Sequence, residues 1–221
     1  GLVKAALISG SGGFDKSMRG ECLKVAPNHG IQIVADETYG AADTDMTAQL
    51  TKIKGSGALA VLNAGFGQGP AIVTRNHEQV GVGLPLYQSH GVASDEYLKL
   101  SGKVAEGVRL PTPALLIGAM LPDADAQKAI VIGYDKTYKD RYKIDPSTFG
   151  GYALDALNLS VDAIKRAGGT DREKVRAALE STKGFVGTTG VFNMSAKDHM
   201  GLDLSAFRMV EVKNGEWQLS K

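Results

Sequence analysis

Three ring side chains stand where predicted strands end, and such rings can bind small organic molecules. Phe14 and Phe66 each follow an apolar run, and His90 follows a further one. Because the carboxyl ends of parallel strands form the ligand crevice of open α/β sheets, the three rings could line one wall of a pocket. The alternative is that Phe14 and Phe66 cap the core of the lobe, with His90 as a histidine at its rim.

Two short loops carry Phe66 and His90. They read Gly65-Phe66-Gly67-Gln68-Gly69 and Ser89-His90-Gly91, and each begins directly after an apolar run. The loops contain rings and glycines rather than ordinary turn residues. We interpret them as the floor of a small-molecule site.

Patterns for catalysis, metals and nucleotides are weak. Gly10, Lys16 and Ser17 have P-loop spacing, but Asp15 stands where a phosphate loop needs glycine. Pro70 replaces the third glycine of the dinucleotide fingerprint. There is no Gly-x-Ser-x-Gly elbow and no histidine pair at metal-ligand spacing. The sequence therefore favours a protein that is not an enzyme, with no metal and no cofactor.

The composition is typical of a folded protein whose positive and negative charges nearly balance. The 221 residues include 25 basic and 24 acidic side chains, so the net charge is +1. Such a balance gives no reason to expect a nucleic-acid partner. No apolar run approaches the roughly 20 residues of a membrane span.

Strands and helices alternate four times in the first half of the chain. Apolar runs predict strands at 3–9, 31–37, 58–62, 84–87 and 108–112. Helical spacing and capping residues predict helices at 15–28, at 45–54, from Pro70 to about Val80, and at 94–101. The alternation predicts a doubly wound parallel-sheet α/β lobe that covers about residues 2–113.

The pattern changes after residue 114. Three successive helices are predicted at 123–142, 147–167 and 171–182. Short strands follow at 189–194, 206–212 and 216–219, with Asn214-Gly215 as a hairpin turn between the last two. The second helix is apolar nearly all round, so it requires burial on more than one side. This region resembles the helical remainder of a second lobe whose sheet is missing.

Several motifs, in order along the chain, carry a resemblance to a known family. They include GSGGFDKS at 10–17, TDMTAQL at 44–50, LPLYQSHGVASDEYLKL at 84–100 and GTTGVFNMSAKDHMG at 187–201. Together they resemble the periplasmic solute-binding proteins of branched-chain amino acid type ABC importers, which are type I periplasmic binding proteins. The TDMTAQL segment is the most specific part of the match.

The resemblance implies two α/β lobes that close on a ligand. Residues 2–113 would form the carboxy-terminal lobe, about 114–204 the returning part of the amino-terminal lobe, and 205–221 the final return. Most of the amino-terminal lobe would then lie outside this sequence. The implied function is periplasmic capture of a small ligand, such as a branched-chain or aromatic amino acid, for an ABC permease in the membrane.

The resemblance also implies which residues touch the ligand. Phe14 stands where an aromatic ring covers the ligand, and Gly65 and Phe66 give a second contact. His90, followed by Gly91, stands where amino-acid binders often carry an acid for the ammonium group of the ligand. A histidine is not a fixed negative charge, so a related small carboxylate or amide is an alternative ligand. From the other lobe, the helix that begins with Phe149 and Tyr152 is expected to face the cleft.

Two other functions fit the same sequence. The fold could serve as a ligand-sensing module of a signalling receptor, or as an enzyme on a doubly wound sheet. The enzyme requires a strongly perturbed acid or base beside a nucleophile, and no such pattern is visible. We also expect the chain to self-associate, because the helices after residue 114 would expose apolar faces without the rest of their lobe.

Overall fold

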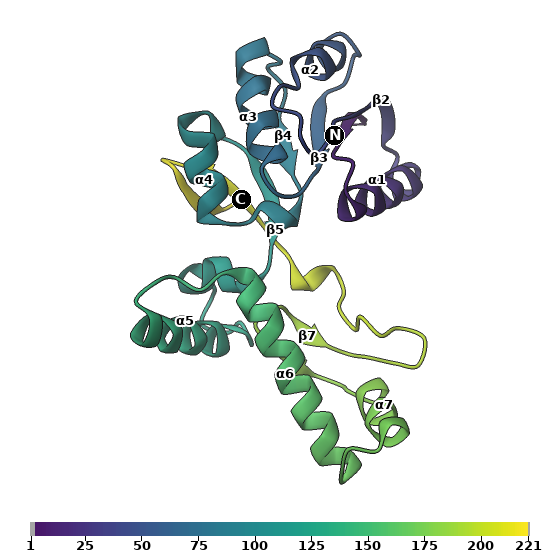
Figure 1. Ribbon diagram of the computed structural model, residues 1–221, viewed down its shortest axis with the longest axis vertical. Coiled ribbons are helices and arrows are strands. Elements are labelled where there is room, and N and C mark those ends of the chain that lie inside the picture. Colours follow the sequence, from purple (N-terminus) through teal and green to yellow (C-terminus); the bar gives the residue numbers. More distant parts are fainter. Residues whose placement is uncertain (1–2, 221) are drawn as a thin grey trace. The chain divides into compact units, whose positions relative to one another are not determined.

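The structure is a computed structural model that describes residues 3–220. It divides into two compact units (Figure 1). Unit 1 extends to Pro111 and resumes at Met209, while unit 2 comprises Thr112–Arg208. Each unit is described by itself below.

Unit 1 is built on a seven-stranded, mainly parallel sheet with strand order β2-β1-β3-β4-β5-β8-β9. The strands are β1 Lys4–Ser9, β2 Gln32–Thr38, β3 Ala60–Ala64, β4 Leu86–Gln88, β5 Arg109–Thr112, β8 Arg208–Lys213 and β9 Glu216–Leu219. The helices between them are α1 Gly13–Val25, α2 Thr47–Lys54, α3 Gly69–Val80 and α4 Asp95–Ser101. The pairs from β2 to β5 are parallel, and β8 and β9 form an antiparallel hairpin. The predicted α/β fold class is confirmed.

Helices pack on both faces of this sheet. Met18 and Cys22 of α1 line an apolar hollow together with Leu62 of β3. The next residue of β3, Asn63, points to the other face, because side chains alternate along a strand. On that face α3 packs between α2 and α4. This two-sided cover explains why the strands are apolar almost throughout.

In unit 1, helices α1 and α2 each begin two residues away from the predicted start. Helix α1 begins at Gly13, because the Asp15 carboxylate accepts a hydrogen bond from the Gly12 amide (3.0 Å) and so lies inside the first turn. Helix α2 begins at Thr47, because the Asp45 carboxylate bonds to the amide of Thr47 (2.8 Å) and holds the preceding residues in a turn. In both places a carboxylate satisfies an amide that the helix leaves free.

Unit 2 contains three helices and a small antiparallel strand pair. The helices are α5 Lys128–Tyr142, α6 Thr148–Ala167 and α7 Arg172–Glu180, and the strands are β6 Phe185–Val186 and β7 Val191–Phe192. Helix α6 ends at Gly168, which adopts the left-handed conformation (φ 70°). Helix α5 begins five residues later than predicted, because Asp125 bonds to the Gln127 amide (2.9 Å) in a turn.

A buried carboxylate fixes the loop between β6 and β7. Asp155, in the middle of α6, is 3% exposed. It accepts hydrogen bonds from the amides of Thr188 (2.8 Å) and Thr189 (2.7 Å) and from the Thr188 hydroxyl (3.1 Å). An added Cβ at Gly187 would lie 2.7 Å from this carboxylate, so the loop packs directly on it.

Replacing Asp155 by alanine should destabilise unit 2 strongly. Removal of the carboxylate leaves one buried and one partly buried amide without an acceptor, and we expect a loss of about 3 kcal/mol in the free energy of unfolding. Asp162→Asn on the same helix is the control, with a loss within about 0.5 kcal/mol because its ion pair with Arg166 is partly exposed. Urea unfolding measures both, and equal effects of the two substitutions would contradict this account.

Candidate functional site

The three predicted ring side chains of unit 1 lie together. Phe14 is in the first turn of α1, Phe66 follows β3, and His90 opens a short 3-10 turn after β4. The ring centroids of Phe14 and Phe66 are 5.8 Å apart, and those of Phe14 and His90 are 5.5 Å apart with an edge-on geometry. The predicted convergence of these rings is confirmed, and we call them the ring cluster. Their contact with a ligand stays a prediction.

The ring cluster is a surface and not a cap on the core. Phe14 is 37% exposed and Phe66 is 50% exposed. The core beneath them consists of fully buried residues such as Leu7, Ile8 and Val61. Aromatic rings that keep this much exposed area are available for contact with another molecule.

Glycine at position 91 allows the rings to approach the backbone. An added Cβ at Gly91 would lie 3.0 Å from Cδ2 of Phe66 and 3.5 Å from Cε1 of Phe14. A larger residue would therefore displace the Phe66 ring. Gly91 belongs to the ring cluster through packing, because it forms the surface against which both phenylalanines rest.

Position 65 requires glycine because of Tyr39, not because of the rings. An added Cβ there would lie 2.2 Å from the hydroxyl of Tyr39, which is buried beneath the loop. The Gly65 carbonyl also accepts a hydrogen bond from the Ser89 hydroxyl (2.6 Å). This bond joins the loop of Phe66 directly to the loop of His90, and both of its partners are buried.

The titratable groups nearest the rings are His90 and Asp15. Burial lowers the pKa of His90, which favours the neutral imidazole. Asp15 is the acid beside Phe14 in the chain, but one of its oxygens bonds to Gly12 and the other is buried. The part of the site in unit 1 therefore presents apolar rings and a neutral imidazole.

The two predicted residues of unit 2 lie in the first two turns of α6. The rings of Phe149 and Tyr152 meet edge-on with centroids 5.7 Å apart. Phe149 is half exposed, and burial raises the pKa of the Tyr152 hydroxyl. Ser147 caps this helix by accepting a bond from the Gly150 amide (3.2 Å). The structure thus brings these two rings together within their own unit.

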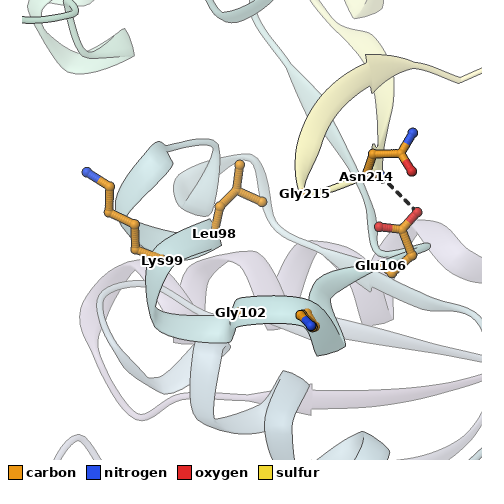
Figure 2. Close-up of a pocket in the computed structure, with 7 residues that line it drawn as sticks. Leu98, Lys99, Gly102, Glu106, Asn214 and Gly215 are labelled. Atoms are coloured by element: carbon orange, nitrogen blue, oxygen red, sulfur yellow. Dashed lines mark hydrogen bonds between the residues drawn. The ribbon is translucent and has the colours of Figure 1, made fainter.

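A hollow of about 630 Å³ lies at the amino-terminal end of the parallel strands, and the ring cluster lies at their carboxyl end. Figure 2 shows Leu98 and Lys99 of α4 on one side of it and Asn214 of the β8–β9 turn on the other. The backbone amide of Asn214 donates a hydrogen bond to the carboxylate of Glu106 (3.1 Å), a residue that precedes β5. This is the amino-terminal end of the parallel strands, whereas ligands of such sheets bind at the carboxyl ends. We therefore place the candidate site at the ring cluster.

Within residues 3–220, no group of three or more histidine, cysteine, aspartate or glutamate side chains could hold a metal ion. Over the same range, no helix combines the length and the apolar character that crossing a bilayer requires.

Sequence reasoning missed the residues that support the loops. Tyr39 and Ser89 were not singled out, and neither were the amides of Asn63 and Gln88, which are fully buried. A signal for the amides was present, because each is a polar residue inside or at the end of an otherwise apolar strand. Such residues require a buried hydrogen-bond partner.

Comparisons with known proteins agree with this fold. The periplasmic binding protein family matches residues 1–216. The leucine-, isoleucine-, valine-, threonine-, and alanine-binding protein of Pseudomonas aeruginosa is 27% identical over 172 residues, which cover 76% of this chain and 43% of that protein.

Solved structures resemble the whole of the chain. An extracellular ligand-binding receptor from Rhodopseudomonas palustris HaA2 has a TM-score of 0.91 at 25% identity, covering 100% of this chain and 64% of its own. A type 1 periplasmic binding protein from Bordetella pertussis Tohama I has a TM-score of 0.81 at 26% identity, covering 99% and 61%. A leucine binding protein from Thermotoga maritima shares the fold, with a TM-score of 0.82 at 21% identity, covering 99% and 60%.

The fold is of the α/β class, with a mainly parallel seven-stranded sheet in unit 1. The chain belongs to the periplasmic binding protein family. It spans less than two thirds of the length of the relatives named here.

The stability of the chain should fall as the pH drops below about 6.5. Burial lowers the pKa of both His90 and His77, so the unfolded chain binds more protons than the folded chain in this range. The free energy of unfolding therefore decreases as the pH falls from the pKa of these histidines in the unfolded chain towards their lower pKa in the folded chain. In the double variant His90→Gln/His77→Gln, the free energy of unfolding should decrease less over the same pH range.

Thermal unfolding between about pH 8 and pH 5 measures this effect. His29→Gln, at an exposed histidine, is the matched control for the effect of replacing an imidazole by an amide. A double variant with the same pH dependence as the unchanged chain would contradict the assignment.

Proposed function

We propose that the chain is the ligand-binding part of a periplasmic solute-binding protein that captures a small molecule and delivers it to an ABC permease. Lobe closure would remove the ligand from water and present a closed surface to the permease. The observation that carries the proposal is the exposed ring cluster at the carboxyl ends of parallel strands, in a chain of this family.

The proposed ligands are branched-chain or aromatic amino acids, or related small carboxylates or amides. The Pseudomonas relative is named for leucine, isoleucine, valine, threonine and alanine. Apolar rings such as Phe14 and Phe66 suit an aliphatic or aromatic side chain. A neutral His90 can donate or accept a hydrogen bond, which suits a carboxylate or an amide better than an ammonium group.

Phe149 and Tyr152 are proposed as the contribution of unit 2 to the same ligand. Gly65, Phe66, His90 and Gly91 would contact it from unit 1 together with Phe14. The proposal assigns no catalytic step, no cofactor and no nucleic-acid partner to the chain.

Titration calorimetry with a panel of amino acids and aromatic acids tests this function. Because most of the opposing lobe is proposed to lie outside the chain, we expect dissociation constants weaker than about 1 µM. Phe14→Ala and His90→Ala should each weaken binding at least about tenfold, without any chemical conversion of the ligand.

Tyr142→Ala is the control, because Tyr142 is also an exposed aromatic residue but lies on α5. Sub-micromolar binding by the 221-residue chain would contradict the account based on two lobes. Conversion of a ligand that depends on His90 would contradict the assignment as a binding protein.

Self-association of the chain is also part of the proposal, and a second copy is the proposed occupant of the exposed face of α6. Leu157 is 60% exposed and Val161 is 40% exposed on that face. Two apolar side chains one turn apart form a stripe that association would remove from water.

Light scattering at increasing concentration should therefore show a mass above that of one chain. Leu157→Lys should shift the mass towards the monomer, whereas Glu173→Lys on the exposed side of α7 should not. A monomer at all concentrations would contradict this part of the proposal.

A further inference from the structure

A buried chain of polar side chains runs beneath the ring cluster. The Tyr39 hydroxyl donates to Oδ1 of Asn63 (3.3 Å), and Nδ2 of Asn63 donates to Oε1 of Gln88 (2.9 Å). Nε2 of Gln88 then donates to Oγ1 of Thr74 (3.0 Å), which shares a hydrogen bond with the Tyr97 hydroxyl (2.7 Å). All five residues are at most 5% exposed. We call this set the amide chain.

The amide chain lies at the ends of the two strands that lead into the ring-bearing loops. Asn63 lies three positions before Phe66, and Gln88 lies two positions before His90. The two amides face one another across paired positions of β3 and β4. A change in their separation would therefore move the starting points of both loops.

The loop of Phe66 is also held at its far end. Nε2 of Gln88 donates a second hydrogen bond to the Pro70 carbonyl (3.2 Å), where α3 begins. Tyr39 supports the same loop from below, since an added Cβ at Gly69 would lie 2.5 Å from its ring. The Ser89–Gly65 bond ties its near end. Phe66 thus sits on a loop with three polar or packed anchors.

We propose that the amide chain and Ser89 are positioning residues, which hold the loops so that the ring cluster is formed before any ligand arrives. The Pro70 carbonyl can only accept a hydrogen bond, so it fixes the orientation of the Gln88 amide, and the bond from Asn63 to Oε1 of Gln88 then fixes that of Asn63. An apolar pair would fill the space without fixing that orientation. A preformed binding surface loses less conformational freedom when the ligand binds.

Ring-to-ring NOEs in the ligand-free 221-residue chain test this inference without a ligand. The unchanged chain should give cross-peaks between Phe14 and Phe66 and between Phe14 and His90. Gln88→Leu should lose the Phe14–Phe66 cross-peak while the chain remains folded. Asn76→Leu is the matched control, because Asn76 is also a buried amide and bonds to the Met46 amide (2.9 Å) away from the loops.

If Gln88→Leu does not fold, a second pair of less disruptive substitutions, Ser89→Ala and Ser9→Ala, tests the same inference. Ser89 and Ser9 are both fully buried, but only the Ser89 hydroxyl has a hydrogen-bond partner within the described residues. Ser89→Ala should weaken the Phe14–Phe66 cross-peak, and Ser9→Ala should preserve it. Unchanged cross-peaks in folded Gln88→Leu and in Ser89→Ala would overturn the inference and leave the amide chain with a purely structural role.

The ligand part of the inference rests on the proposed function and is measured separately. With L-leucine, L-phenylalanine and benzoate as probes, Gln88→Leu should weaken binding at least about tenfold relative to Asn76→Leu. If the unchanged chain binds none of the probes while the cross-peaks respond as expected, the positioning role stands and the proposed function fails. If probes bind equally well to both variants and the cross-peaks do not change, the inference fails and the proposed function stands.

Discussion

Parallel pairing of β1, β3 and β4 is the constraint from which the rest of unit 1 follows. Ser9 pairs with Ala64, and Asn63 pairs with Gln88, so the three strands end at nearly the same level of the sheet. Their loops must therefore leave the sheet side by side. Helices α1 and α3 begin within a few residues of those ends, so the connecting loops are short and Phe14, in the first turn of α1, stays close to the sheet. The meeting of Phe14 with its neighbours is thus a consequence of register.

That constraint has a second consequence inside the sheet. Strands buried on both faces normally hold only apolar side chains, yet β3 and β4 each place an amide where the loops begin. A buried amide is tolerated only when its donors and acceptor are used. Here Asn63 donates to Gln88, and Tyr39, Thr74 and the Pro70 carbonyl use the remaining groups of the two amides. The sheet therefore combines an apolar core with one polar connection, and this connection lies directly beneath the surface that we assign to the ligand.

Much of this arrangement could be predicted from the sequence, for identifiable physical reasons. Apolar runs and glycines define the strands, and the helix predicted at 94–101 corresponds to α4, which Ser94 caps. The convergence of the rings could be predicted because the carboxyl ends of parallel strands meet at one end of the sheet. The starts of α1 and α2 could not be predicted, because Asp15 and Asp45 bond to nearby amides in ways that several local conformations allow. The hydrogen bond from Ser89 to the Gly65 carbonyl joins two different loops. The residue spacing within either loop does not show that these two residues meet in the fold.

The central claim is that the ring cluster of unit 1 is the surface that binds the ligand. The most direct measurement is an NMR titration of the chain, labelled at phenylalanine, histidine and leucine, with a mixture of apolar amino acids and aromatic acids. The account predicts that the resonances of Phe14, Phe66 and His90 shift together, while those of Leu98 beside the hollow in Figure 2 stay in place. Saturable shifts at Leu98 with no response from the three rings would contradict it.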